Sequence, residues 1–263
     1  MGRQIVYKLK LMYQKTPILK KIKKKIIYFL TKIFLRTVDR FFNTSIEEII
    51  RRNLLNLHSQ RYKILKNKYY FIHVPKTGGT TFHHHLQVNL KKQLFNFNHP
   101  YIYNYYTHFP LKKNHPFKKD NKYFTIIRNP LYRVYSFYVD CLSNKKNVFH
   151  NVAKRGIKNF CFKCWEAQNL YTKYYSGDLF DVNINSLSEA KKNLSNFFFL
   201  LDFDYLDNDI IKISSKLNLP SKQFEIKNTK KYNSPSLSDL NVIKKYNEFD
   251  TQLYDYFKKE IKI

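Results

Sequence analysis

Residues 69–81, which read YYFIHVPKTGGTT, constrain the fold of this chain more than any other segment. A strand-like apolar run stops at Pro75 and is followed by Lys76, by two adjacent glycines and by three threonines, and then by a histidine-rich stretch that can begin a helix. A strand, a glycine-rich turn and a helix in that order build a pocket for a phosphate. The turn aims several backbone N–H groups at one point, and the helix dipole adds partial positive charge there.

Strand-like and helix-like segments alternate along the rest of the chain, which indicates a parallel α/β sheet with covered faces. We therefore expect a P-loop-like three-layer α/β fold, with a central, mainly parallel sheet flanked by helices. The predicted strands are 69–74, 122–130 and 196–203, and the predicted helices are 80–90, 131–143, 161–175, 205–218 and 236–259. Residues 144–160 read as a basic linker, and the stretch between 175 and 196 reads as an Asn-rich and Ser-rich connection.

The chain divides into two parts of different character. Residues 1–65 are basic, read as helical and carry no chemical motif, so we interpret them as an N-terminal extension of a domain that spans 66–263. Residues 20–40 contain a basic amphipathic helix, a pattern that suits an anionic membrane surface and suits packing on the domain equally well. No apolar run is long enough to span a bilayer, and no signal-peptide cleavage site is evident. We expect a cytoplasmic or peripheral membrane protein.

The formal net charge of +29 favours partners that are polyanions, namely nucleic acid, anionic lipid or acidic small molecules and glycans. A solvated basic surface is an equally good interpretation. The three cysteines, Cys141, Cys161 and Cys164, argue against a disulfide framework and for a reducing compartment. Cys161 and Cys164 form a CxxC pair without a second pair to complete a zinc site, so we interpret them as neighbouring, partly buried thiols.

The turn at 75–81 does not match the loop of nucleoside triphosphatases. That motif places its lysine after the glycines and before Ser or Thr, whereas Lys76 follows Pro75 and precedes the glycines. We also see no acidic residue at the end of a later apolar strand that is an obvious magnesium ligand. The order suits a 5′-phosphate or phosphosulfate held by backbone N–H groups and by Thr80 and Thr81. A tight turn that starts a helix, with no ligand, is the structural alternative.

The second predicted strand supplies another candidate phosphate ligand. Arg128 stands where this apolar strand ends, and Ser136 follows eight residues later in the predicted helix. An arginine fork and a hydroxyl together can hold a phosphate. Two such sites at the carboxyl ends of strands fit one nucleotide that carries two separate phosphates. Each residue alone could equally be structural, Arg128 in a salt bridge and Ser136 as an ordinary helix residue.

PKTGGTT after the FIHV strand, followed by IIRNPLYRVYSFY at 126–138, resembles the sulfotransferases that use 3′-phosphoadenylyl sulfate (PAPS). It is most similar to the carbohydrate branch that includes the heparan and uronyl 2-O-sulfotransferases. The resemblance continues through residues 169–177, 190–210 and 233–257, and so covers roughly 68–260. Members of the family often have Asp where this chain has Asn129, a departure that removes no phosphate ligand.

The resemblance implies PAPS as co-substrate, a glycan or polysaccharide acceptor and transfer of a sulfuryl group to a carbohydrate hydroxyl. It assigns the 3′-phosphate to Arg128 and Ser136. It assigns the 5′-phosphosulfate to Lys76, Thr77, Gly78, Gly79, Thr80 and Thr81. Lys76 would also stabilise charge on the bridging oxygen. This chemistry requires no metal, and the sequence contains no clear metal cluster.

A histidine is the expected general base, because its pKa lies near neutral pH. We assign this role to His108, because this branch of the family carries a histidine before an aromatic residue between the two nucleotide motifs. The alternatives in the sequence are His99 and His115 in the same loop-rich region and the histidines at 83–85 beside the turn.

Two other functions fit parts of the sequence. A basic nucleic-acid-binding protein would explain the charge and the interleaved aromatic residues, although no recognition helix or RNA-binding motif supports it. A nucleotide-dependent phosphotransferase could use the same glycine turn. An anionic membrane surface contacted by residues 20–40 would be compatible with the sulfotransferase hypothesis.

Overall fold

The computed structural model of the chain describes residues 69–79, 81–82, 110–117, 119, 121–216 and 233–261. Several sequence predictions fall outside these residues: the extension over 1–65, the amphipathic helix within 20–40, and the site residues Thr80 and His108. The boundary between 65 and 66 stays a prediction. In the described ranges, no helix is long and apolar enough to cross a bilayer.

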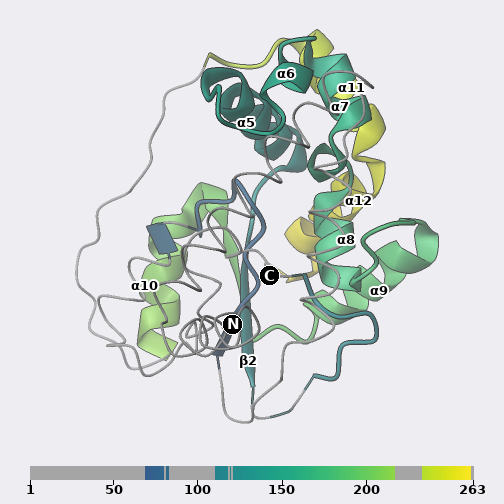
Figure 1. Ribbon diagram of the computed structural model, residues 1–263. Helices are drawn as coiled ribbons and strands as arrows, with labels where there is room; N and C mark the ends of the chain where they lie inside the picture. Colours follow the sequence, from purple (N-terminus) through teal and green to yellow (C-terminus); the bar gives the residue numbers. More distant parts are fainter. Residues whose placement is uncertain are drawn as a thin grey trace, which may run out of the picture. The chain divides into compact units, whose positions relative to one another are not determined.

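Within the described residues, three parallel strands form the sheet, in the order β1-β2-β3 (Figure 1). They are β1 (Tyr69–Phe71), β2 (Lys122–Ile127) and β3 (Phe199–Asp202). Phe124 of β2 stands opposite Phe71 on one side and opposite Phe199 on the other. Because the strands are parallel, the segments that follow all three begin at one edge of the sheet, where ligands of such sheets bind. This confirms an α/β arrangement with a parallel sheet.

Helices lie on both faces of this sheet. Side chains alternate along a strand, so Phe124 and Ile126 pack with Ile210 and Ile213, two residues of α10 (Leu206–Lys216). Ile127 faces the other way and belongs to the larger apolar cluster, which is built mainly from the remaining helices. Figure 1 shows α10 on one side of β2 and α8, α9 and α12 on the other.

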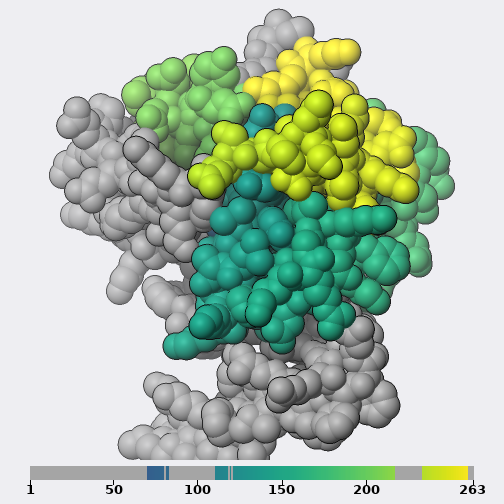
Figure 2. Space-filling view, turned by 90° about the horizontal axis from the view of Figure 1, so that it is seen from above, coloured from purple at the N-terminus to yellow at the C-terminus, as the bar shows by residue number. Residues whose placement is uncertain are grey.

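The remaining helices follow the strands in chain order. They are α5 (Pro130–Ser143), α6 (His150–Ala153), α7 (Ile157–Lys163), η1 (Trp165–Ala167), α8 (Leu170–Ser176), α9 (Ile184–Leu194), η2 (Phe203–Tyr205), α11 (Leu237–Tyr246), α12 (Glu248–Tyr256) and the π-helix η3 (Phe257–Ile261). In Figure 2 the lime-coloured α11 lies against the teal-green surface that α5 and α7 build. The strand predicted at 122–130 is observed as β2, which ends at Ile127, and the helix predicted after it is α5, which already includes Pro130.

Two sequence predictions about the connections are wrong. Residues 144–160 contain α6 and the first turn of α7, so they are more than a linker. The Asn-rich and Ser-rich stretch contains α9, whose apolar residues Leu187, Ala190 and Leu194 are buried at helical spacing. Asn183 and Ser186 form a capping box at the start of this helix. Some Asn and Ser residues of the stretch therefore indicate a helix start and not a loop.

The third correction concerns the long helices predicted at 161–175 and 236–259. The first is interrupted where α7 ends and Asn169 adopts a left-handed backbone conformation before α8. The second is interrupted at Asn247, which separates α11 from α12. The Asn247 side chain is fully buried and bonds the carbonyl of Ala167, so a tertiary contact ends α11 there.

The three cysteines are fully buried and none forms a disulfide bond with another described residue, so Cys161 and Cys164 are more deeply buried than predicted. Burial raises the pKa of Cys161 to about 12, which keeps this thiol protonated. Within the described ranges, no group of three or more His, Cys, Asp or Glu side chains could hold a metal ion.

Candidate functional site

The glycine turn leaves the carboxyl end of β1 and folds tightly back on itself. Lys76 and Gly78 both have left-handed backbone angles, with φ of 70° and 82°. The Thr77 hydroxyl is fully buried and donates to the Val74 carbonyl at 2.8 Å. The N–H of Thr81 then donates to the Gly78 carbonyl at 3.1 Å, which starts a helical turn. The chain therefore makes the predicted order of strand, turn and helix start, although the strand ends at Phe71, three residues earlier than predicted. The Thr77 side chain closes the turn from inside.

Both glycines of the turn are closely covered. A Cβ atom on Gly79 would lie 2.1 Å from Nε2 of His73, so the imidazole occupies the space that a side chain would need. A Cβ atom on Gly78 would meet the Phe203 ring at 3.0 Å and Leu206 at 3.2 Å. Gly78 is thus favoured both by its backbone angle and by packing, whereas Gly79 is favoured by packing against the His73 ring alone.

Arg128 and the glycine turn meet, as the sequence predicts for two parts of one anion site. Nη1 of Arg128 donates to the Lys76 carbonyl at 3.2 Å, and the guanidinium lies over the Phe203 ring at 4.2 Å from its centroid. The side chain is half-buried between these groups. An arginine fork held by an aromatic face and a carbonyl is oriented before any ligand arrives.

Lys76 reaches towards α5, the helix that also carries Ser136. Its Nζ lies 3.6 Å from Oδ2 of Asp140, and both side chains are about a quarter exposed, at 25% and 27%. Ser136 is buried and lies one turn before Asp140, which places the two on the same helix face. The helix itself starts with Pro130 in its first turn and with the Asn129 side chain accepting from the Leu131 N–H. Asn129 therefore serves as an N-cap, a role that Asp fills as well.

A buried tyrosine holds the backbone of Arg128. The Arg128 N–H donates to Oη of Tyr171 at 3.0 Å, and the Tyr171 hydroxyl donates to the Arg128 carbonyl at 2.8 Å. Burial raises the pKa of Tyr171 well above its ordinary value, so the hydroxyl keeps its proton and can make both bonds.

His115, one of the alternative bases, lies elsewhere. It is buried against Phe117 and Tyr123, and its Nε2 is 3.1 Å from Oη of Tyr123 near the amino end of β2. Burial, with a smaller contribution from Lys112, lowers its pKa to about 4. Arg128 follows the opposite end of the same strand, so His115 does not belong to this site. The other histidines considered, at 83–85, 99 and 108, lie outside the described residues.

One acidic residue ends the later apolar strand β3, although the sequence did not indicate it as an obvious magnesium ligand. Asp202 is the last residue of β3 and is fully buried. Its Oδ2 accepts from Nζ of Lys258 at 2.5 Å, and its Oδ1 accepts from the Asp204 N–H at 3.0 Å. Desolvation lowers the pKa of Lys258, but the hydrogen bonds to Asp202 and Tyr254 outweigh it and raise this pKa overall.

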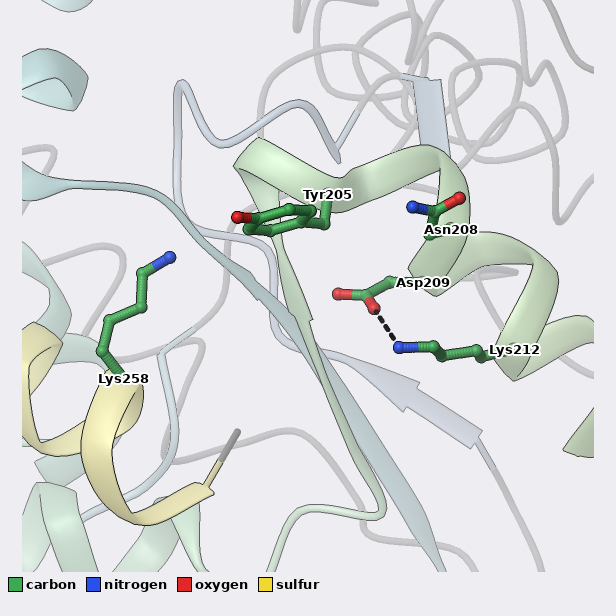
Figure 3. Close-up of a pocket in the computed structure, with 5 residues that line it drawn as sticks. All are labelled: Tyr205, Asn208, Asp209, Lys212 and Lys258. Atoms are coloured by element: carbon green, nitrogen blue, oxygen red, sulfur yellow. Dashed lines mark ion pairs between the residues drawn. The ribbon is translucent and has the colours of Figure 1, made fainter. Parts of the chain in front are cut away.

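A pocket of about 470 Å³ lies beside this pair (Figure 3). Lys258 approaches it from the C-terminal segment, and the other lining residues come from η2 and α10. They are Tyr205, Asn208, Asp209 and Lys212. Lys212 pairs with Asp209 at 3.6 Å, so most of the lining charge is balanced within the pocket. None of these residues was predicted as part of a site.

Sequence reasoning also missed the side chains that hold the candidate ligands. Phe203, Asp140 and Tyr171 contact Arg128 or Lys76, and His73 covers Gly79. A local signal existed only for His73, which stands inside the FIHVPKTGG stretch. The others are distant in sequence and resemble ordinary core or surface residues.

No protein-family model matches the chain, and a search of curated proteins finds no matching relative. Proposals about function therefore depend on the motif pattern and on the geometry of this site.

Proposed function

We propose that this chain is a sulfotransferase that moves a sulfuryl group from 3′-phosphoadenylyl sulfate to a hydroxyl of a carbohydrate acceptor. The observation that supports it most is the contact between Arg128 and the glycine turn, 3.2 Å from Nη1 to the Lys76 carbonyl. It brings two groups suited to phosphate to the carboxyl edge of one parallel sheet. A nucleotide with phosphates at its 5′ and 3′ positions needs two such groups close together.

The donor would be held from two sides. The turn from Lys76 to Thr81 takes the 5′-phosphosulfate, and Arg128 with Ser136 takes the 3′-phosphate. Because the Thr77 hydroxyl is buried and donates to Val74, Thr77 contributes through its backbone. The ion pair with Asp140 keeps the Lys76 ammonium near the turn.

The proposed transfer is an in-line displacement at sulfur, with His108 as general base. The acceptor oxygen forms a bond to sulfur while the bond from sulfur to the bridging phosphate oxygen breaks. The hydroxyl proton passes to His108, and 3′,5′-adenosine bisphosphate leaves. Lys76 stabilises the negative charge that grows on the bridging oxygen, together with the N–H groups of the turn.

Calorimetric titration with 3′,5′-adenosine bisphosphate tests the donor. We expect wild-type protein to bind it, and Arg128→Ala and Lys76→Ala to lose about tenfold or more in affinity, as for a charge-assisted hydrogen bond. Arg155→Ala removes an exposed arginine between α6 and α7 and serves as the charge-matched control. No affinity in the wild type rejects the proposal, and displacement of the bisphosphate by ATP at equal concentration favours a phosphotransferase.

Labelled sulfate tests the transfer step. With PAPS carrying the label and a panel of polysaccharides as acceptors, His108→Ala should retain bisphosphate affinity and lose transfer. Retention of full transfer by this variant would exclude His108 as the base.

A further inference from the structure

Arg128 stands at the point where β2 leaves the sheet. The last paired residue of β2 is Ile127, which stands opposite Asp202. Beyond that pair, the Tyr171 hydroxyl bonds both the N–H and the carbonyl of Arg128, at 3.0 and 2.8 Å. A hydroxyl can do this because it has one donor and two acceptor sites. The Tyr171 side chain thus bonds the backbone N–H and carbonyl of Arg128, as a neighbouring strand bonds these groups along β2.

These two bonds decide where the Arg128 side chain goes. The N–H and the carbonyl belong to the two peptide planes on either side of its Cα atom, and those planes are rigid. Holding both fixes the backbone angles of Arg128 and so the direction of its Cβ atom. The guanidinium then reaches the Phe203 ring and the Lys76 carbonyl.

Tyr171 is itself placed by the C-terminal helices. It lies in the first turn of α8, where backbone N–H groups lack partners within the helix. The carboxylate of Asp250 in α12 accepts from the N–H groups of Tyr171 and Thr172 at 2.9 and 2.8 Å. It also accepts from the Thr172 hydroxyl at 2.9 Å. Asp250 is fully buried. Through these bonds it caps the start of α8 from a distant part of the chain.

The capping is reciprocal. Oδ1 of Asn169, before α8, accepts from the N–H groups of Phe249 and Asp250 in the first turn of α12, at 3.1 and 3.2 Å. Asn247, before α12, accepts from the Asn169 N–H at 3.0 Å. The two helix starts therefore exchange caps, and neither can move without the other.

We infer that Tyr171 is a positioning residue for the anion-binding guanidinium of Arg128, and that α12 sets its place through Asp250. The inference rests on the proposed function, because it takes the 3′-phosphate as the ligand of Arg128. It adds a role for the C-terminal helices, which contribute no residue to the predicted donor site.

Tyr171→Phe tests the inference, and Tyr175→Phe is its matched control. Tyr175 lies one turn further along α8, is equally buried and stacks on Tyr171 with 6.0 Å between ring centroids. Its hydroxyl is 2.8 Å from Oγ1 of Thr125, in the middle of β2. Each variant loses one buried hydroxyl from the same helix, and Tyr171→Phe alone releases Arg128. The affinities of both variants for 3′,5′-adenosine bisphosphate and for adenosine 5′-phosphate are measured by calorimetry.

We expect Tyr171→Phe to lose about tenfold in affinity for the bisphosphate and to bind adenosine 5′-phosphate nearly as the wild type does. Tyr175→Phe should bind both ligands nearly as the wild type does. A general loosening of the fold would weaken the binding of both ligands alike. A loss of affinity for the bisphosphate alone is therefore specific to Arg128. Equal bisphosphate affinities of the two variants overturn the inference and leave the donor proposal intact. Wild-type protein without bisphosphate affinity rejects the donor, and the inference with it.

If Tyr171→Phe does not fold, Thr172→Val takes its place. This variant removes one of the contacts to Asp250 and leaves the Tyr171 hydroxyl in place. It should lose about threefold in bisphosphate affinity with no change for adenosine 5′-phosphate. An unchanged bisphosphate affinity would then overturn the inference.

Discussion

The two ends of β2 are built in opposite ways. After the carboxyl end, Arg128 remains half-exposed beside a turn that contains two left-handed residues, Lys76 and Gly78. Near the amino end, Tyr123 is buried among rings, with Tyr70 stacked at 5.1 Å between centroids and Phe117 at 4.9 Å. The same strand therefore ends in solvent-accessible positive charge on one side and in a closed aromatic cluster on the other.

The ionisable groups at the two ends differ in exposure and in charge. Lys76 and Arg128 keep partial contact with water, so their charges cost little and can attract an anion. His115 is held without charge, because burial lowers its pKa to about 4. One end of the strand is thus suited to binding and the other to stability. Substitutions at the two ends should separate these properties.

The largest effect on the free energy of unfolding is expected when a glycine near each end of β2 is replaced by alanine. Gly177 caps α8 with φ of 76°, and a Cβ atom there would lie 2.4 Å from the backbone of Lys112 and Lys113, in the segment before β2. Backbone cannot rotate away, so Gly177→Ala should lower the free energy of unfolding by about 3 kcal/mol or more. Gly79→Ala meets the His73 ring, which can rotate, and should cost about 1–2 kcal/mol.

The losses of bisphosphate affinity in Gly79→Ala and Gly177→Ala should have the opposite order to their losses of stability. Displacing His73 disturbs the turn, so Gly79→Ala should lose more bisphosphate affinity than Gly177→Ala. Urea unfolding followed by the fluorescence of the single tryptophan, Trp165, and calorimetry measure the two properties. A larger loss of stability in Gly79→Ala than in Gly177→Ala would contradict the comparison.

Low pH should reduce the free energy of unfolding through His115, which lies in the aromatic cluster near the amino end of β2. The pKa of His115 is about 4 in the fold and 6.5 in its ordinary state, so the unfolded chain takes up this proton first. The stability gained from a neutral His115 is complete above pH 6.5 and is lost as the pH falls from 6.5 towards 4. It amounts to at most about 3 kcal/mol. The measurement is urea unfolding of wild type and His115→Gln at pH 7 and pH 4.5. If both proteins lose the same stability between these pH values, His115 is not the cause.

The smallest effect is expected at the ion pair of the binding end. Lys76 and Asp140 are 3.6 Å apart and partly exposed, so Asp140→Asn should change the free energy of unfolding by less than about 1 kcal/mol. Removing the negative charge should raise bisphosphate affinity about twofold to fivefold at low salt, and the gain should shrink as salt screens it. Calorimetry at two salt concentrations measures this. A tenfold loss would instead mean that Asp140 is needed to hold Lys76 in place.

Local signals predicted the elements that local chemistry controls. The apolar run of β2 and the Asn129–Pro130 start of α5 were both readable from the sequence, and the structure has them there. The helix α9 was missed because a buried stripe of three apolar residues stands among polar ones. Its stability comes from packing against α8, which no local pattern displays.

The sequence by itself determined the strand, the glycine turn and the position of Arg128 after an apolar strand, because these depend on backbone angles and on residues that are neighbours in the chain. Only the tertiary structure decided what holds them. Tyr171 meets Arg128 across 43 positions, and Asp250 meets Tyr171 across 79. Such contacts arise when buried polar groups must find partners in a closed core, and their choice of partner depends on how helices pack. The same rule placed His115 in the aromatic cluster, far along the strand from the site where its sequence position had made it a candidate.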